Sequence, residues 1–332
     1  MRIIFTFIAL LAWLLVPHSA YSATLPGIPE FIDEMVAKHQ FKRDELEKVF
    51  ARAQHRPDVI EAISRPATTK PWLEYRAAFV NRQRVQFGLE FWNKYRHTLR
   101  RAEQQYGVPQ EIIIAVIGVE TIYGRNAGNF RVLDALITLA FDYPRRAPFF
   151  RSELENYLLL ARDQQFDLLD IRGSYAGAMG IPQFMPSSYR NYAVDFNNNR
   201  TIDLLRENVD AIGSVANYLQ GYGWIKGEPV AVLAQVGVEL PEISAKKIST
   251  GEIKTSRSLP EWAAAGVTPH KTFVREMPAR LIDFTVEEGK EYWLAFNNFE
   301  IITRYNNSDF YAMTVFQLAE ELKAARKVSQ PK

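Results

Sequence analysis

The chain has 332 residues, 47% of them hydrophobic, which is enough for more than one packed substructure. Its 40 Lys and Arg residues nearly balance 38 Asp and Glu residues, so the net charge gives no support to nucleic-acid binding. The sequence contains no cysteine, which excludes disulfides, thiolate catalysis, cysteine-ligated metals and a lipid anchor on an N-terminal cysteine. Because the 5 histidines form no pair with metal-ligand spacing, chemistry must depend on carboxylates, amides and hydroxyls.

The first residues predict a secretory signal peptide. Arg2 precedes an uncharged apolar run over residues 3–16, and the small residues Ala20 and Ser22 suit a cleavage site. The apolar run is too short to cross a bilayer comfortably, although an uncleaved signal anchor is the alternative. We therefore expect residues 1–22 to be removed and the mature chain to act in a bacterial periplasm, where proteins without disulfides are common.

Residues 23–108 have a helical pattern, with apolar side chains recurring at helical spacing between charged ones. Gly107 and Pro109 end this pattern, and a proline at this place also suits the first turn of a new helix. We expect that helix to run from Pro109 to Tyr123.

This second helix carries the most informative residue of the chain. Glu120 is the sole carboxylate within an almost wholly apolar run over residues 112–124. A helix that is apolar on nearly every side belongs in a core, where burial raises the pKa of a carboxyl group. A glutamic acid that is protonated at neutral pH can give a proton to a leaving group. Glu120 is thus a candidate general acid, and a hydrogen-bonded structural carboxyl group is the alternative.

Two more buried helices are expected over residues 132–140 and 149–163, and a third over residues 209–222. Between them, glycines and prolines over residues 173–189 predict a shaped loop whose backbone can approach a ligand closely. The loop carries uncharged hydrogen-bonding groups and flat aromatic faces, both of which sugars need; these are Ser174, Gln183, Tyr175 and Phe184. Ordinary packing of a glycine-rich loop is the alternative.

From residue 229 onward the pattern changes to short alternating or β-branched runs, which predict strands. They lie at residues 230–234, 271–275, 279–284, 291–296 and 300–305, with a polar insertion over residues 241–266. Residues 311–325 then form an amphipathic pattern, which predicts a closing helix that packs on the helical body.

Residues 195–203 resemble a calcium-binding loop, because oxygen-bearing side chains stand at every second position. The candidate ligands are Asp195, Asn197, Asn199 and Thr201. Arg200 stands where the sharp turn of such loops takes glycine, and Arg206 stands where a bidentate glutamate is expected. An asparagine-rich turn without a metal is the alternative.

Taken together, separated motifs resemble the lytic murein transglycosylase B family. The matching motifs lie at residues 118–124, 174–180, 183–189, 210–218 and 302–312. The resemblance covers essentially the whole mature chain. It implies an α+β fold, mainly α, with a lysozyme-like catalytic core. Combined with the pattern of elements, it predicts an N-terminal helical region (23–108), the catalytic core (109–228), a β-rich domain (229–305) and a C-terminal segment (306–332).

The resemblance also implies the reaction, which is cleavage of the β-1,4 bond between N-acetylmuramic acid and N-acetylglucosamine in peptidoglycan. Glu120 matches the single catalytic acid of the family. The residues that match the glycan groove are Tyr75, Arg145, Arg146, Ser174, Gln183, Tyr218, Tyr305, Asn306 and Tyr311. Asp210 matches a later calcium ligand, although an extra residue separates it from Ile202. The reaction requires no cofactor, and calcium would be structural. Expected partners are glycan strands, together with cell-wall synthesis or division proteins.

A glycosidase that hydrolyses its substrate uses two carboxylates, and the motifs supply no obvious second one beside Glu120. A lytic transglycosylase needs one, because the O6 hydroxyl of the muramic acid attacks its own anomeric carbon and leaves a 1,6-anhydro sugar. Glu120 would first protonate the glycosidic oxygen and then accept the proton of O6. A hydrolytic muramidase and a non-catalytic peptidoglycan-binding protein are the alternatives.

Overall fold

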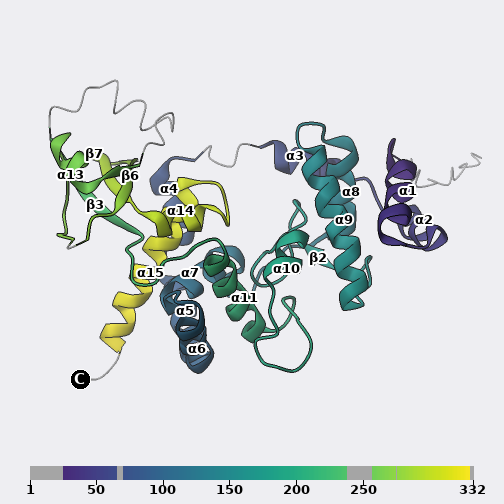
Figure 1. Cartoon of the computed structure of the whole chain (residues 1–332), viewed down its shortest axis with the longest axis horizontal. Coiled ribbons are helices and arrows are strands. Elements are labelled where there is room, and N and C mark those ends of the chain that lie inside the picture. The colour runs from purple at the N-terminus through teal and green to yellow at the C-terminus, as the bar shows by residue number, and fades with distance from the viewer. Residues whose placement is uncertain (1–24, 66–69, 238–255, 274, 330–332) are drawn as a thin grey trace, which may run out of the picture. The chain divides into compact units, whose positions relative to one another are not determined.

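The computed structural model describes residues 25–65, 70–237, 256–273 and 275–329 (Figure 1). The chain divides into two compact units, with the boundary between Gln54 and His55. The predicted signal peptide and most of the predicted polar insertion lie outside the described residues. Among the residues that are described, no helix combines the length and apolar character needed to cross a membrane. The domain boundaries at residues 108, 228 and 305 stay a prediction.

The first unit contains a pair of helices, α1 (Ile28–His39) and α2 (Arg43–Ala51). Gln40 ends α1 with a left-handed backbone (φ 58°), which turns the chain toward α2. Phe31 and Phe50 are buried, and their ring centroids lie 6.1 Å apart. The apolar positions at helical spacing therefore meet between the two helices, as the sequence predicts.

The second unit is mostly helical. Its helices before the sheet are α3 (Pro57–Ser64), α4 (Trp72–Phe79), α5 (Arg82–Lys94), α6 (Arg96–Tyr106), α7 (Gln110–Thr121), α8 (Val132–Asp142), α9 (Ala147–Gln164), α10 (Pro186–Tyr192) and α11 (Asn208–Gly221). Those within or after the sheet are α13 (Leu259–Ala264), α14 (Asn297–Thr303) and α15 (Asp309–Ser329). Helix α7 lies against α5, α6, α11 and α15 (Figure 1). Its residues from Ile112 to Val119 are all buried, because a helix that is apolar on every side must be enclosed.

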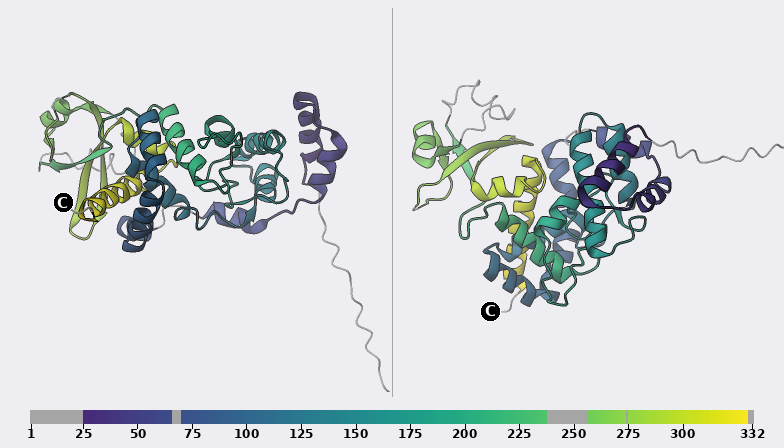
Figure 2. Two further views of the ribbon diagram at one scale, coloured as in Figure 1. Left: turned by 90° about the horizontal axis from the view of Figure 1, so that it is seen from below. Right: turned by 45° about the vertical axis from the view of Figure 1, so that its right-hand side comes forward.

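A single antiparallel sheet follows, with the strand order β4-β6-β7-β3-β5. Its strands are β3 (Ala231–Val236), β4 (Arg257–Ser258), β5 (Val267–Pro269), β6 (Pro278–Val286) and β7 (Gly289–Ala295). Trp262 of α13 is buried against the sheet, and its indole nitrogen donates to the carbonyl of Ala279 at 2.8 Å. Both views in Figure 2 show the yellow helix α15 beside this sheet, and α14 and α4 pack against β7 and β6. The predicted fold class, α+β and mainly α, is confirmed.

Two of the predicted strands are wrong. Residues 300–305 were expected to be extended, but most of them belong to α14, where Phe299 and Ile302 lie one helical turn apart and are fully buried. The β-branched pair Ile301-Ile302 favours a strand locally, and burial of one helical face overrides that preference. The described residues 271–273 also form no strand. The edge strand β5 ends at Pro269, and the last backbone hydrogen bond to β3 is donated by His270 to the carbonyl of Leu233 at 2.8 Å.

Candidate active site

The end of α7 presents Glu120 at the edge of the buried core. The next residues leave the helix because Ile122 and Tyr123 both have left-handed backbones (φ 51° and 61°). The hydroxyl of Thr121 donates to the carbonyl of Ile181 at 2.8 Å and accepts the N–H of Gly124 at 2.9 Å. These contacts fix the last turn of α7 against the glycine-rich loop.

Glu120 opens into a cavity of about 740 Å³. The cavity is bordered by α9, α10, α11, the glycine-rich loop and the connection between α14 and α15. Its lining residues are Glu120, Arg146, Phe149, Phe150, Glu153, Ser174, Tyr175, Ala176, Ala178, Gln183, Met185, Ser187, Ser188, Tyr218, Tyr222, Arg304, Tyr305, Asn306 and Asn307. Neutral polar groups and aromatic rings dominate this surface, which suits an uncharged polyhydroxylated ligand.

The surroundings of Glu120 control its protonation. Burial raises the pKa of the carboxyl group to about 7, and the hydroxyl of Tyr311 opposes this rise by donating a hydrogen bond to Oε1 at 2.5 Å. The carboxyl group is therefore close to half protonated at neutral pH. Burial also raises the pKa values of Tyr305 and Tyr311 well above that of an ordinary tyrosine, and the charge of Glu120 raises both further. Both phenols thus stay neutral hydrogen-bond donors beside the carboxyl group.

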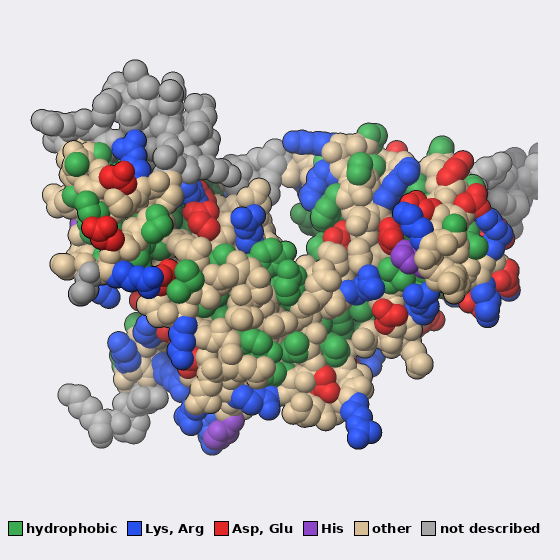
Figure 3. Space-filling view, in the orientation of Figure 1, with side chains coloured by type: hydrophobic (Ala, Val, Ile, Leu, Met, Phe, Trp, Pro, Cys, Tyr) green, Lys and Arg blue, Asp and Glu red, His purple; other side chains and the backbone are tan. Residues whose placement is uncertain are grey.

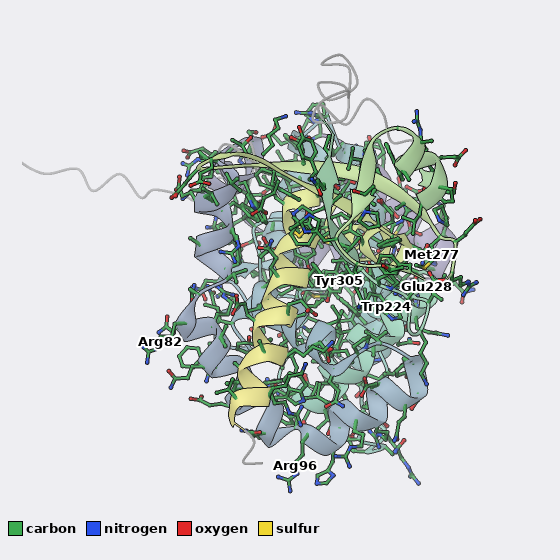
Figure 4. All side chains as sticks on the ribbon, turned by 90° about the vertical axis from the view of Figure 1, so that its left-hand side faces the viewer. Arg82, Arg96, Trp224, Glu228, Met277 and Tyr305 are labelled. Atoms are coloured by element: carbon green, nitrogen blue, oxygen red, sulfur yellow. The ribbon has the colours of Figure 1, made fainter. Side chains whose placement is uncertain are left out.

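Aromatic rings continue outward from Glu120 along one wall of the cavity. The ring centroids of Tyr305 and Tyr218 are 4.8 Å apart, and those of Tyr218 and Tyr222 are 4.6 Å apart. Phe184 packs behind both Tyr305 and Tyr218. The hydroxyls of Tyr305 and Tyr218 donate to the carbonyls of Pro182 and Arg304, at 2.5 and 2.7 Å. Figure 3 colours tyrosines together with the hydrophobic side chains, and side chains of this class lie near the middle of the face shown, over α11. In Figure 4, Tyr305 lies inside the molecule near α15, whereas Arg82 and Arg96 project from its edge.

The glycine-rich loop is held by its own side chains. The Oγ of Ser174 accepts the N–H groups of Ala176 and Ala178, at 3.3 and 3.0 Å. Gln183 has a left-handed backbone (φ 51°), and its amide nitrogen donates to the carbonyls of Ala127 and Gly180, both at 2.9 Å. The loop is also tied to the short ribbon of β1 (Phe130–Arg131) and β2 (Arg172–Gly173). Ser174 and Gln183 are therefore both fixed in place at the cavity wall.

The structure brings most of the predicted site residues together. Those that line the cavity are Glu120, Arg146, Ser174, Gln183, Tyr218, Tyr305 and Asn306. Tyr311 is buried behind the wall and reaches Glu120 from α15. Tyr75 packs against Phe310, and burial together with the charge of Glu120 raises its pKa. Arg145 is exposed and does not line the cavity, in contrast to Arg146, whose guanidinium lies 4.5 Å from the ring centroid of Phe149.

Sequence reasoning missed a second carboxylate in the cavity, Glu153 of α9. Its Oε1 accepts the hydroxyl of Ser187 at 2.6 Å, and its Oε2 accepts the N–H of the same residue at 2.9 Å. A signal was present, because Glu153 falls on the same inward helical face as Phe150 and Tyr157. An acid on a buried face needs a partner, and here the partner is the first turn of α10.

In the predicted calcium loop, the side-chain oxygen atoms accept hydrogen bonds from backbone N–H groups of the same loop. Both carboxylate oxygens of Asp195 accept backbone N–H groups, from Asn199 at 3.1 Å and Arg200 at 2.6 Å. Asn197 and Asn199 likewise accept the N–H groups of Asn199 and Thr201. Both oxygens of the buried Asp210 accept backbone N–H groups, from Phe196 and Asp203.

The charge of the loop does not suit a calcium ion. Among the described residues, no three His, Cys, Asp or Glu side chains are grouped so that they could hold a metal ion. Arg200 adopts the left-handed conformation (φ 72°) that glycine normally supplies, and Arg206 replaces the bidentate acid. The loop keeps Asp195 and Asp210, but two arginines stand where a calcium loop has a glycine and an acid.

Three comparisons relate this chain to known proteins. A family model described as Transglycosylase SLT domain matches residues 25–320. The chain is 46% identical over 314 residues to membrane-bound lytic murein transglycosylase B of Escherichia coli (strain K12). The aligned region covers 92% of this chain and 84% of that protein. The structure of Escherichia coli lytic transglycosylase Slt35 in complex with calcium has a TM-score of 0.85 at 46% identity and covers 93% of this chain and 96% of that one. Pseudomonas aeruginosa SltB3 in complex with NAG-NAM-pentapeptide has a TM-score of 0.79 at 29% identity and covers 89% of this chain and 78% of that one.

The family and enzyme class predicted from the motifs are confirmed by these matches. The family model extends over most of the chain, and the Escherichia coli protein is similar along nearly all of it. The chain therefore belongs to the Transglycosylase SLT domain family, together with the lytic murein transglycosylases of the B type.

Proposed function

We propose that this chain cleaves the β-1,4 bond between N-acetylmuramic acid and N-acetylglucosamine in peptidoglycan and leaves a 1,6-anhydromuramic acid end. The observation that carries the proposal is Glu120, a carboxyl group with a pKa of about 7 at the wall of a large cavity lined with aromatic and neutral polar groups. A group whose pKa lies near the working pH can both give and accept a proton.

The first step is the transfer of the Glu120 proton to the glycosidic oxygen. As the bond from that oxygen to the anomeric carbon breaks, the N-acetylglucosamine leaves with a hydroxyl group and Glu120 becomes a carboxylate. Tyr311 stabilises this carboxylate, because its hydroxyl donates to Oε1. The neighbouring phenol of Tyr305 donates to the carbonyl of Pro182 and stays uncharged, so it does not compete with the charge of Glu120.

In the second step the O6 hydroxyl of the muramic acid attacks the anomeric carbon. Glu120 accepts the O6 proton and is restored to its starting form, so that no water is consumed. Ser174 and Gln183 are proposed to bind sugar hydroxyls, since the amide nitrogen of Gln183 is engaged by the backbone and its oxygen is left to accept. Tyr218, Tyr305, Asn306 and Tyr75 would form the remaining contacts with the glycan.

Arg145 and Arg146 are proposed to meet the carboxylates of the peptide stems. Arg146 lines the cavity, and the related SltB3 structure contains a NAG-NAM-pentapeptide. Both side chains are exposed, which suits a contact with the part of the substrate that extends out of the cavity. We further propose that the enzyme acts in the periplasm and that calcium has a structural rather than a catalytic role in it. Recruitment by cell-wall synthesis or division proteins stays a prediction.

A hydrolytic muramidase is the second candidate, because Glu153 supplies another carboxylate at the cavity. Two observations speak against a catalytic role for this residue. Its side chain is only 4% exposed, and Ser187 engages both of its oxygens. A nucleophile or general base needs a free oxygen that faces the substrate. We infer instead that Glu153 holds α10 in place beside the cavity.

The experiment is to digest purified peptidoglycan with the mature chain and to weigh the released muropeptides by mass spectrometry. We expect products that are one water lighter than those of a muramidase. Glu120→Gln should lose activity by at least about 100-fold, because general acid catalysis normally contributes that much. Hydrated reducing ends would support the hydrolase, and an active Glu120→Gln variant would contradict the proposed role of Glu120.

A further inference from the structure

Arg280 of β6 forms an ion-pair cluster that the catalytic proposal does not use. Its side chain is only 10% exposed. Its two terminal nitrogens donate to the two carboxylate oxygens of Asp309 at 2.8 and 2.7 Å, and its Nε donates to Glu300 at 2.8 Å. A planar guanidinium that is bound at both ends in this way fixes its partners in direction as well as in distance.

The two partners stand on either side of a short connection that lines the cavity. Glu300 belongs to α14, and Asp309 is the first residue of α15. The residues between the two helices, 304–308, include Arg304, Tyr305, Asn306 and Asn307 of the cavity wall. A single arginine of the sheet therefore clamps both ends of the segment that carries these groups.

The same cluster lies two residues from the partner of the catalytic acid. Asp309 faces the sheet, and Tyr311, about 200° further around the helix axis, faces α7 and donates to Glu120. The first turn of α15 is thus held between a bidentate ion pair on one side and the Tyr311–Glu120 hydrogen bond on the other. A shift of this turn would change the distance from Tyr311 to Glu120 directly.

We propose that Arg280 is a positioning residue for the reaction, which clamps α14 and α15 to the sheet and so holds Tyr311 against Glu120 and Tyr305 with Asn306 at the cavity wall. This inference rests on the proposed role of Glu120. The action of Arg280 is mechanical, because its charge is neutralised by two carboxylates and does not contribute to the protonation of Glu120.

The ionisable groups whose interaction with Glu120 is resolved are all tyrosines. They are Tyr75 from α4, Tyr218 from α11, Tyr305 from the connection and Tyr311 from α15. Of these, Tyr311 is the one that changes the pKa of Glu120, by lowering it. Loss of its hydrogen bond would therefore raise that pKa. Since Glu120 must be protonated to act as an acid, the alkaline limb of the pH profile of kcat would move to higher pH.

The test compares Arg280→Gln, Arg280→Lys and Tyr311→Phe in the full mature chain on soluble glycan strands, with kcat, KM and the pH profile of kcat as readouts. Asp309 and Glu300 are 41% and 42% exposed, so that water can solvate them once Arg280 is gone and the variants should fold. The control is Lys290→Gln, which breaks a 2.8 Å ion pair with Asp283 in the same β6–β7 hairpin. Because the Asp283 side chain is only 4% exposed, this variant sets an upper limit to the stability that loss of an ion pair in the sheet removes by itself.

We expect Tyr311→Phe and Arg280→Gln to lower kcat by about tenfold or more and to move the alkaline limb in the same direction. The double variant should add no further pH shift, because both changes break the same contact. Arg280→Lys keeps the charge and should show the same shift in smaller degree. Arg280 is merely structural if the alkaline limb moves in Tyr311→Phe but not in Arg280→Gln, while the melting temperature of Arg280→Gln falls as in Lys290→Gln. That result would contradict this inference and leave the proposed function intact. An active Glu120→Gln variant would instead remove the proposed function itself.

Discussion

At the scale of single residues, Glu120 shows that the burial which suits its proposed role as a general acid has a cost in stability. The residue follows a run of buried apolar residues over 112–119 in α7, and the same burial that encloses this run raises the pKa of Glu120 from 4.5 to about 7. The hydrogen bond from Tyr311 stabilises the Glu120 carboxylate and so offsets part of the loss in stability. The fold therefore favours the protonated acid, which is the form that the first step of the proposed mechanism consumes.

This cost predicts a pH-dependent difference in stability between the wild type and Glu120→Gln. A carboxyl group with a raised pKa in the folded state contributes stability that is complete below pH 4.5 and is lost as the pH rises through about 7. Glutamine does not titrate. The wild type should therefore lose up to about 3 kcal/mol relative to Glu120→Gln between pH 4.5 and pH 8. Urea unfolding at both pH values measures this difference, and a constant gap would mean that the carboxyl group has an ordinary pKa.

The sequence identified Glu120 because a lone carboxylate in an apolar run is a local signal. Glu153 carries a similar signal, since it shares the inward face of α9 with Phe150 and Tyr157, but it lies 33 residues beyond Glu120 and outside every matching motif. Its partner Ser187 lies 34 residues away in another helix. A contact of that range depends on how α9 and α10 pack, which residue patterns do not specify.

At the scale of elements, Glu153 and α10 give a prediction that separates support from catalysis. Glu153→Gln removes the carboxylate that accepts the N–H and hydroxyl of Ser187 in the first turn of α10. We expect a loss of about 1 kcal/mol, as for other helix N-terminal acceptors, and unchanged anhydro products. Thermal unfolding and mass spectrometry of the products check both. Hydrated products, or a total loss of activity in a folded variant, would assign Glu153 to the chemistry.

The glycine-rich loop depends on a close approach of two backbones. Gly128 has a left-handed backbone (φ 91°), and a Cβ there would lie 2.2 Å from the carbonyl oxygen of Gly173. Gly128→Ala should therefore push the loop that carries Ser174 away from β1 and lower both stability and kcat/KM. Gly227 is the matched control, because it also has a positive φ (81°) but an added Cβ would have no neighbour within 4 Å.

Both alanine variants carry the strain of a positive φ, which costs about 1 kcal/mol. The clash should make Gly128→Ala less stable than Gly227→Ala by a further 1–3 kcal/mol, roughly the cost of overpacking. Only Gly128→Ala should lose activity. Equal stabilities and equal activities would mean that the loop can move away from Gly128 without consequence.

Elements whose apolar periodicity matches the side that they bury could be predicted from the sequence, whereas α14 could not. The helices around residues 132–140 and 149–163 and the strands β6 and β7 follow apolar periodicity closely. The run Ile301-Ile302-Thr303 has the β-branched composition of a strand, but it joins the sheet to α15 and buries one helical face instead. Tertiary packing decides such short segments.

At the scale of the whole molecule, the aromatic wall is the feature that only the fold assembles. Phe184, Tyr218, Tyr305 and Tyr311 come from the glycine-rich loop, α11, the α14–α15 connection and α15, and they meet beside Glu120. Each segment was identified through its motif, yet no spacing in the sequence indicates which tyrosine touches the acid. Their convergence requires α15 to return across α7 after the sheet, which is a property of the topology.

The fold also determines whether the loop at residues 195–203 can bind a metal, and here shape and charge disagree. Asp195 organises the loop by accepting the N–H groups of Asn199 and Arg200, but Arg200 and Arg206 add two positive charges where glycine and glutamate are expected. The Slt35 structure with calcium shows that a related enzyme holds the ion. For this chain we expect a dissociation constant no tighter than about 1 mM, since affinity in such loops follows the number of charged ligands.

Addition of about 1 mM calcium should then stabilise the wild type by no more than about 0.4 kcal/mol, which is a shift of at most about 1 °C in the melting temperature relative to EDTA. The double variant Arg200→Gly/Arg206→Glu restores both the turn and the bidentate acid and should show a clearly larger, calcium-specific rise. Magnesium at the same concentration is the control, because it demands a near-ideal octahedral shell and gives up its bound water reluctantly. A wild-type shift of several degrees with calcium alone would mean that Asp195 and Asp210 rearrange to hold the ion despite the two arginines.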